Sequence, residues 1–338
     1  MRKLALLFSM VSISVALTAQ QYKVANRINS PGDSGWDYLF ADSSERKLYV
    51  THGSEVIVID LDSQKAVGRI TGLNRIHGVA IADEVHRGFI SDGGSNQVVV
   101  FDTQSNSEIQ RIKAGTNPDG IVFDPASNRV FAFNGRSNDA TVIDAATGKV
   151  AGTMALGGKP EFSVSDGKGN LFVNIEDKSE IAKINPTTIE VVSRWPLAPC
   201  EEPSGLAMDA ANRRLFAVCS NQKMAVVDAD SGKMVAIVPI GNGPDATAFD
   251  QVKGLIFSSN GQDGTITVVK EDSPNKFSVL ETDSTEKSAR TMALDGKTHN
   301  LYLSSAQLGT PPPATAANPH PRPTVVPNTF HVLVVSPR

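Results

Sequence analysis

The stretch that decides the fold is residues 115–160, which read GTNPDGIVFDPASNRVFAFNGRSNDATVIDAATGKVAGTMALGGKP. It contains four short runs typical of β-strands, IVF, RVFAF, ATVID and VAGTMAL, separated by the turn sequences DPAS, NGRSN and DAATGK. A four-stranded antiparallel sheet made of β-branched and aromatic residues has two apolar faces, so one unit cannot bury itself. The stretch therefore predicts a repeated unit whose copies pack against one another.

Two sets of residues recur at a period of about 42 residues, which indicates a repeat architecture. The polar residue that ends the third strand of each unit is Asp60, Asp102, Asp144, Asn185, Asp228 and Lys270. The aromatic residue of the second strand is Tyr49, Phe89, Phe131, Phe172, Phe216, Phe257 and Tyr302. Seven aromatic positions predict seven repeats. Because no long stretch has apolar residues at helical spacing, the expected fold class is all-β.

The last repeat has no fourth strand, because the chain ends soon after its third. Residues 300–305 and 330–336 form its second and third strands, and a Pro-rich loop insertion, 306–329, separates them. Residues 21–30 resemble the fourth strands of the other repeats, so we expect them to pair with 330–336 and close a ring. The prediction is one seven-bladed β-propeller domain, 20–338, of four-stranded antiparallel blades. A linear solenoid is the alternative, but it would need capping repeats instead of complementary ends.

The N-terminus has the features of a secretory signal peptide over residues 1–19. Arg2 and Lys3 precede an apolar run, residues 4–17, and small residues surround a cleavage position after Ala19. We therefore expect an exported protein, periplasmic or extracellular. No apolar run reaches 18 residues, so we expect no membrane insertion.

The charge of the chain disfavours nucleic-acid binding. The sequence has 32 Lys and Arg against 36 Asp and Glu, and its formal net charge is −4 with His neutral. The basic residues are scattered through the repeats, whereas binding to phosphates needs a clustered basic face.

The second-strand segment Tyr49-Val50-Thr51-His52 differs from the tetrapeptide Tyr-Val-Thr-Asn at one position. The joints GTNPDG, GGKPEF and GNGPDA between repeats, and the TGK-type turns after the third strands, match the same pattern. The chain resembles the YVTN-repeat β-propellers of the secreted, YncE-like kind over essentially all of its mature length. This resemblance implies the fold; it implies little about function, because the family includes surface, DNA-binding and uncharacterised proteins.

In a propeller the first strand of each blade is innermost, so its first residues lie at the mouth of the central channel. The residues at this position are Asp37, His77, Asp119, Glu161, Ser204, Asp245 and Arg290. The loop after the second strand of each repeat lies on the same face. Polar residues at this loop are therefore expected to form a second, wider ring, which comprises His52, Asp92, Asn134 and Asn260.

These residues predict a polar funnel that binds a small polar ligand, a protein partner or one divalent cation. Asp119, Glu161 and Asp245 are the candidate metal ligands, since hard cations favour carboxylate oxygens. The alternative is that the residues are wet turn residues, because Asp in Pro-Asp-Gly ordinarily bonds to its own backbone. The same explanation, hairpin capping, accounts for Asp60, Asp102, Asp144 and Asp228 on the opposite face.

Cys200 and Cys219 are expected on one face of the fifth blade, where an oxidising compartment favours a disulfide. Two separate thiols remain the alternative, because strand register does not fix the distance between them.

The sequence contains no Gly-x-Ser-x-Gly elbow, P-loop or HExxH motif. The leading hypothesis is therefore a non-enzymatic binding or scaffold protein with its site at the channel mouth. The alternative is a metal-dependent lactonase or lyase in which a mouth cation polarises a carbonyl, with His77 and Arg290 as candidate catalytic residues.

Overall fold

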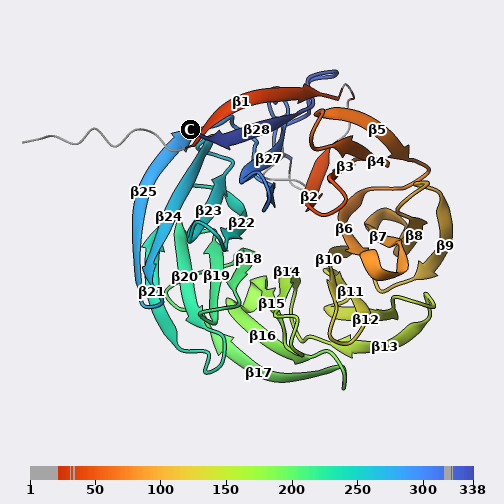
Figure 1. The fold of residues 1–338 in the computed structure, drawn as a ribbon, viewed down its shortest axis with the longest axis horizontal. Helices are drawn as coiled ribbons and strands as arrows, with labels where there is room; N and C mark the ends of the chain where they lie inside the picture. The colour runs from red at the N-terminus through yellow and green to blue at the C-terminus, as the bar shows by residue number, and fades with distance from the viewer. Residues whose placement is uncertain (1–21, 31, 33–34, 316–320, 322) are drawn as a thin grey trace, which may run out of the picture.

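The computed structural model describes residues 22–30, 32, 35–315, 321 and 323–338, so the expected signal peptide, 1–19, lies outside the described residues. Seven four-stranded antiparallel sheets stand in a ring around a central channel (Figure 1). The first strand of each blade contacts the first strands of both neighbouring blades. The fold is a seven-bladed β-propeller, which confirms the predicted fold class and rules out the solenoid.

The first three blades follow one another along the chain. Blade 1 contains β2 (Trp36–Asp42), β3 (Lys47–His52), β4 (Glu55–Asp60) and β5 (Lys65–Ile70). Blade 2 contains β6 (Ile76–Ala82), β7 (Arg87–Asp92), β8 (Gln97–Asp102) and β9 (Glu108–Lys113), with the short 3-10 helices η1 (Asp83–Val85) and η2 (Gly93–Ser95). Blade 3 contains β10 (Pro118–Asp124), β11 (Arg129–Asn134), β12 (Asp139–Asp144) and β13 (Val150–Ala155).

The next three blades repeat this pattern. Blade 4 contains β14 (Pro160–Ser165), β15 (Leu171–Ile175), η3 (Glu176–Lys178), β16 (Glu180–Asn185) and β17 (Glu190–Pro196). Blade 5 contains β18 (Pro203–Asp209), β19 (Arg214–Cys219), β20 (Lys223–Asp228) and β21 (Met234–Pro239). Blade 6 contains β22 (Pro244–Asp250), β23 (Leu255–Asn260), β24 (Thr265–Ser273) and β25 (Lys276–Ser284).

Blade 7 is assembled from both ends of the described chain. It contains β26 (Met292–Asp295), β27 (Asn300–Ser305), β28 (His331–Pro337) and, as its outermost strand, β1 (Tyr22–Asn29). β1 pairs antiparallel with β28, from Tyr22 opposite Pro337 to Asn29 opposite His331. This pairing closes the ring as predicted. It also covers the edge of β28 that would otherwise be unpaired.

The aromatic residues that mark the repeat in the sequence form the core between blades. Tyr49, Tyr302 and the five matching phenylalanines all have 0% exposed surface. Each lies on the second strand of its blade, which is covered by a neighbouring strand on either side. Burial of one such side chain stabilises the fold by about 1.5–3 kcal/mol. The 42-residue period is therefore the period of the packing between blades.

Hairpin turns on the face opposite the channel mouth use aspartate as a cap. Asp144 accepts hydrogen bonds from Thr147, at 2.8 Å from the backbone nitrogen and 2.7 Å from the hydroxyl. Hydrogen bonds from Ser105 to Asp102 and from Ser231 to Asp228 repeat the arrangement. The bonds from Thr147 lower the pKa of Asp144. These aspartates serve the turns, as predicted.

A disulfide joins Cys200, in the loop before β18, to Cys219, the last residue of β19. Both residues are fully buried. The bond therefore ties the loop that leads into β18 to the end of β19, on the mouth face of blade 5. Among the described residues, none of the helices has the length and apolar character needed to cross a bilayer.

Candidate ligand site at the channel mouth

A β-bulge positions the mouth residues. In blades 1 to 5 the pairing of the first and second strands shifts register directly around the predicted mouth residue, for example between Pro118 and Ile121 and between Trp36 and Leu39. Blade 6 has the same shift between Pro244 and Ala246. A bulge releases a residue from regular pairing and re-aims its side chain. Six bulges therefore direct the side chains at the start of the innermost strands toward one opening.

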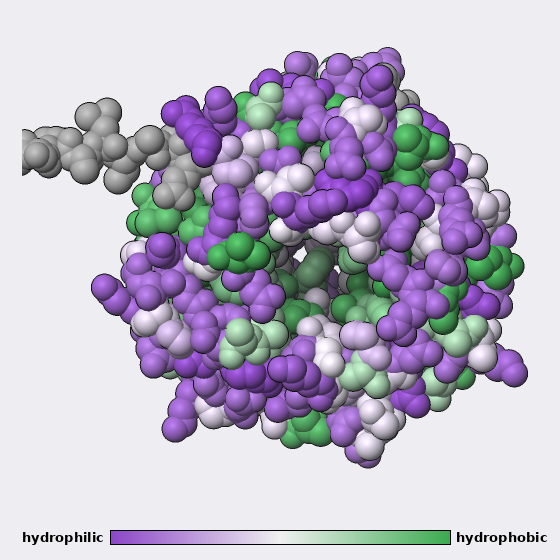
Figure 2. All heavy atoms as spheres, viewed as in Figure 1, coloured by the Kyte–Doolittle hydropathy of each residue, from purple (hydrophilic) through white to green (hydrophobic). Residues whose placement is uncertain are grey.

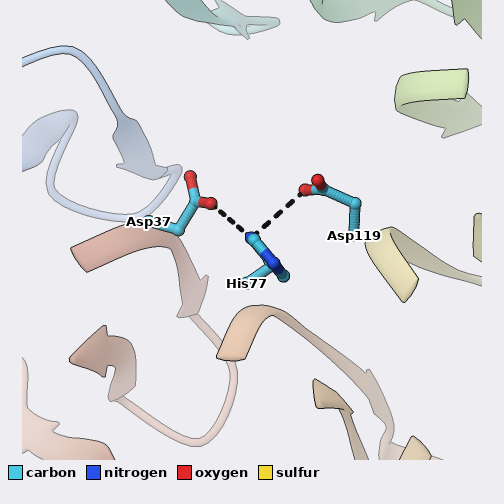
Figure 3. A group of neighbouring side chains, drawn as sticks. All are labelled: Asp37, His77 and Asp119. Carbon is cyan, nitrogen blue, oxygen red and sulfur yellow. Dashed lines mark hydrogen bonds and ion pairs between the residues drawn. The ribbon is translucent and has the colours of Figure 1, made fainter. Parts of the chain in front are cut away.

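Three of these side chains meet directly (Figure 3). The Nδ1 atom of His77 lies 2.7 Å from Oδ2 of Asp37 and 3.5 Å from Oδ1 of Asp119. The three residues come from β2, β6 and β10, the first strands of three consecutive blades. Asp37 and Asp119 therefore hold the imidazole between two carboxylates.

Arg290 and Asp245 continue the ring on the other side of Asp37. The Nε atom of Arg290 donates to Oδ2 of Asp245 at 2.8 Å. Its Nη2 atom lies 3.4 Å from Oδ1 of Asp37 and donates to the carbonyl oxygen of Trp36 at 3.2 Å. One guanidinium thus links blades 6, 7 and 1 and compensates two carboxylates.

Glu161 completes the ring with partners that the sequence prediction missed. Lys159 pairs with Glu161 at 2.7 Å and also with Glu176. The hydroxyl of Tyr38 lies 3.5 Å from the other carboxylate oxygen of Glu161 and donates to it. Lys159 is two residues before Glu161 in GGKPEF, and Tyr38 directly follows Asp37. Both are close in sequence to predicted mouth residues, which was the signal that could have identified them.

Burial disfavours the ionised form of three ring carboxylates and so raises their pKa values. It raises the pKa of Glu161 to about 8, reinforced by Asp119 and opposed by Lys159. It raises the pKa of Asp119 and that of Asp245 to about 6, although His77 and Arg290 oppose these shifts. For His77, burial lowers the pKa, but Asp37 and Asp119 outweigh it and the pKa is raised. These shifts favour the protonated forms of the ring side chains, the carboxylates chiefly because they are buried and His77 because of its two carboxylate neighbours.

Side chains of the second strands hold the backbone of the ring in place. Each lies one residue before the end of its strand and bonds to the mouth residue of the next blade. Ser91 donates to the carbonyl oxygen of Asp119 at 2.6 Å, and Thr51 to that of His77 at 3.2 Å. Asn174 and Ser259 make the same bond to Ser204 and Arg290. A polar residue at this position in most of the repeats, with Phe133 and Val218 as the exceptions, was a signal in the sequence that the prediction did not use.

The predicted wider ring does not form, because its members bond locally. Asp92 accepts from the Asn74 backbone at 3.1 Å and from Gln97 at 2.9 Å. Asn134 donates to Asp139 and Thr141, and Asn260 donates to Thr265 and Thr267. All three side chains are fully buried in their own hairpins.

His52 and Ser204 also differ from the prediction. The ring of His52 stacks on Phe330 at 4.2 Å between centroids and the residue is 3% exposed, so it is buried against a residue next to blade 7 instead of facing the opening. Ser204 donates to the carbonyl oxygen of Pro244 at 3.2 Å. It contributes to contact between blades 5 and 6, and the charged ring comprises the other six predicted residues together with Lys159.

A cavity of about 560 Å³ lies in the channel next to the ring. Its wall begins one residue further along each strand than Asp37, His77 and Glu161, and includes Tyr38, Gly78 and Phe162. Figure 2 shows the opening at the centre of the propeller with apolar side chains in its wall. The wall continues to Pro125, Asp166 and Gly167 beyond the far ends of β10 and β14, so the cavity extends from beside the ring toward the opposite face. A largely apolar cavity next to a few polar groups is typical of small-molecule sites.

The group best placed to hold a metal ion differs from the predicted one. Asp37, His77 and Asp119 bring one donor atom each to within 4.8 Å of one another. The predicted set was Asp119, Glu161 and Asp245. Glu161 and Asp245 are instead occupied by Lys159 and Arg290.

Comparisons with known proteins support the fold. No family model matches the chain, and no curated protein matches it either. Solved structures do match the chain over most of its length. The WD40 repeats of RRP9 match with a TM-score of 0.76 at 9% identity, covering 94% of this chain and 98% of that one. Streptogramin B lyase matches with a TM-score of 0.73 at 13% identity, covering 94% and 98%. Hydrazine synthase of Kuenenia stuttgartiensis matches with a TM-score of 0.69 at 15% identity, covering 86% and 95%.

At these identities the similarity establishes the β-propeller fold alone. The similar structures include a lyase, a synthase and a WD40 protein, so they favour no single activity. The YVTN-repeat resemblance of the sequence has no matching family model to support it.

Proposed function

We propose that this protein is an exported, non-enzymatic binding propeller of the YVTN-repeat type that holds a cation at the channel mouth. The observation that carries the proposal is the charged ring itself. Asp37, Asp119, Glu161 and Asp245 converge there. Carboxylates crowded in a partly buried opening repel one another, and a bound cation removes that repulsion.

The basic side chains of the ring do not balance its carboxylates. Arg290 and Lys159 are the two permanent cations, and Lys159 also pairs with Glu176, which adds a fifth carboxylate. When all five carboxylates are ionised, protonated His77 reduces the excess negative charge without removing it. A cationic ligand therefore complements the ring, and the adjoining cavity leaves room for an organic cation with an apolar body.

Catalysis is not part of this proposal. The likeness to streptogramin B lyase concerns the fold alone, so it does not favour the lactonase or lyase alternative. The segment Tyr49–His52, which matches Tyr-Val-Thr-Asn at three positions, supports the YVTN-type assignment. The signal-peptide features of residues 1–19 support export.

Calorimetric titration of the mature protein tests the proposal. The ligands are Zn²⁺, Ca²⁺ and phenethylamine, with 2-phenylethanol as the uncharged counterpart of the amine. We expect at least one cation to bind and no comparable binding of 2-phenylethanol. At about pH 8.5, where most of Glu161 is ionised because its pKa is about 8, Glu161→Gln should weaken phenethylamine binding about fivefold or more through the lost negative charge.

Glu190→Gln is the matched control, because Glu190 is exposed on the outer strand β17. It should bind each cation as the parent protein does. Binding of no cation, or equal loss of affinity in both variants, would contradict the proposal.

A further inference from the structure

The donor atoms of Asp37, His77 and Asp119 form one compact group at the channel mouth (Figure 3). Zinc binds nitrogen and oxygen donors at about 2.0–2.2 Å, which places neighbouring donors roughly 3.3 Å apart in a tetrahedron. The observed separations from Nδ1 of His77 are 2.7 Å to Asp37 and 3.5 Å to Asp119, on either side of that value. The two carboxylate oxygens lie within 4.8 Å of each other, so the carboxylates must turn toward each other for all three donors to bind one ion.

The second oxygen of each carboxylate already has a hydrogen-bond donor. Arg290 lies 3.4 Å from Oδ1 of Asp37, and the amide of Asn117 lies 3.4 Å from Oδ2 of Asp119. Ligating carboxylates are commonly oriented in this way, through the oxygen that does not face the metal. The arrangement leaves Oδ2 of Asp37 and Oδ1 of Asp119 directed at His77.

The backbone of all three residues is also fixed. Their carbonyl oxygens accept hydrogen bonds from Thr291, Thr51 and Ser91, at 2.8, 3.2 and 2.6 Å respectively. The His77 side chain is 10% exposed, and its Nε2 edge lies against Gly93. Nδ1 is therefore the ring nitrogen presented to the opening. A site held this firmly needs little reorganisation when an ion binds.

We propose that Asp37, His77 and Asp119 form a binding site for a divalent transition-metal ion, with zinc as the test ion. Imidazole together with carboxylates suits this class of metal, whereas Ca²⁺ and Mg²⁺ prefer oxygen donors throughout. Three protein ligands leave a coordination position open toward the channel. This inference rests on the proposed function and names the cation.

Two measurements on the mature protein test the site. Calorimetric titration with Zn²⁺ should show one ion per chain, bound at least about tenfold more tightly than Ca²⁺ or Mg²⁺ because of the nitrogen ligand. Titration with Co²⁺ should produce visible absorption from a nitrogen- and oxygen-coordinated ion, which reports on coordination directly.

Variants assign the ligands. His77→Gln, Asp37→Asn and Asp119→Asn should each weaken Zn²⁺ binding by about tenfold or more, since loss of an outer partner alone costs that much. The Co²⁺ absorption should disappear in His77→Gln. His86→Asn is the control for surface histidines, because His86 is exposed in a turn on the opposite face and its φ of 52° suits asparagine. Circular dichroism and thermal melting confirm that each variant is folded.

Unchanged Zn²⁺ affinity in folded His77→Gln and Asp119→Asn would overturn the site. If Zn²⁺ fails to bind while phenethylamine binds and Glu161→Gln weakens it, the metal site is wrong and the proposed function stands. If no cation binds, both are wrong.

Discussion

Gly93 lies directly against the imidazole of His77: a Cβ atom added at Gly93 would stand 2.7 Å from Nε2 and 2.6 Å from Cδ2. Real Cβ atoms do not approach other atoms so closely, so any larger residue must move the ring. The carbonyl oxygen of Pro118 lies 3.1 Å from the same point and limits how far the added atom can shift. Gly93, in the turn after β7, thus limits where the imidazole of His77 can lie.

Gly93→Ala should therefore displace His77 without removing it. Overpacking of this kind costs about 1–3 kcal/mol of unfolding free energy. We expect lower thermal stability together with weaker Zn²⁺ binding, measured by melting and calorimetry. Gly296→Ala is the matched control, since a Cβ at Gly296 meets no atom within 4 Å. If Gly93→Ala is destabilised but binds Zn²⁺ with normal affinity, the position of His77 does not control metal binding.

Ser91→Ala should loosen the anchor of Asp119. Ser91 is fully buried; its hydroxyl donates to the Asp119 carbonyl and accepts from the Gly78 backbone at 2.8 Å. Alanine leaves the buried N–H of Gly78 without this acceptor, which costs about 1–3 kcal/mol. We expect a lower unfolding midpoint in urea. Ser105→Ala, in an exposed turn, should change the midpoint less, and equal changes in the two variants would count against the anchor.

The period of the sequence was sufficient to predict the fold because the packing between blades repeats with it. Tyr49 and its counterparts are buried at one position of every blade, so the same apolar requirement recurs along the chain. The closing strand was also predictable, since the last blade lacks one strand and residues 21–30 resemble a fourth strand.

The candidate site was predictable only in part. The position of each first strand identified Asp37, His77 and Asp119, because the fold alone brings those positions to one opening. Their partners were not predictable, because pairs such as Arg290 with Asp245 join different blades and depend on side-chain directions set by bulges. The wider ring failed because a residue at a loop can bond within its own hairpin, as Asn134 does with Asp139.

The closing strand should be necessary for cooperative folding. Tyr22 of β1 is fully buried and packs edge-on against Phe257 of blade 6, with 4.9 Å between ring centroids. Tyr22→Ala should lower the unfolding free energy by about 3–5 kcal/mol. Lys23→Ala, at the exposed neighbouring position, should change it little. Deletion of residues 22–29 should broaden the urea transition or cause aggregation, and a deletion protein that unfolds like the full chain would contradict this role.

The disulfide should stabilise blade 5 by constraining the unfolded chain. Cys200 and Cys219 are separated by 19 residues, and closure of such a loop contributes about 3 kcal/mol. Mass analysis of the exported protein without reductant should find both thiols bonded. The Cys200→Ala, Cys219→Ala double variant should have a lower urea midpoint that reductant does not change further. Two freely alkylated thiols in the exported protein would contradict the bond.

Glu271 should make the protein less stable as pH rises. Burial and the neighbouring carboxylate of Asp209 raise the pKa of Glu271 from 4.5 to about 7. The folded protein therefore holds this proton more tightly than the unfolded chain does. The stabilising contribution is complete below pH 4.5 and is lost as pH rises through about 7. At pH 8 the ionised Glu271 faces Asp209 at a cost in stability.

Glu271→Gln should remove this cost, because a neutral amide can donate to Asp209 at every pH. We expect a higher melting temperature than the parent protein at pH 8 and little difference at pH 4. Glu108→Gln is the control with the opposite sign, since Arg111 lowers the pKa of Glu108 through their hydrogen bonds and the charged form is the favoured one. Melting curves of the three proteins at pH 4, 6 and 8 decide the matter. A constant difference between Glu271→Gln and the parent across this range would show that Glu271 does not titrate as inferred.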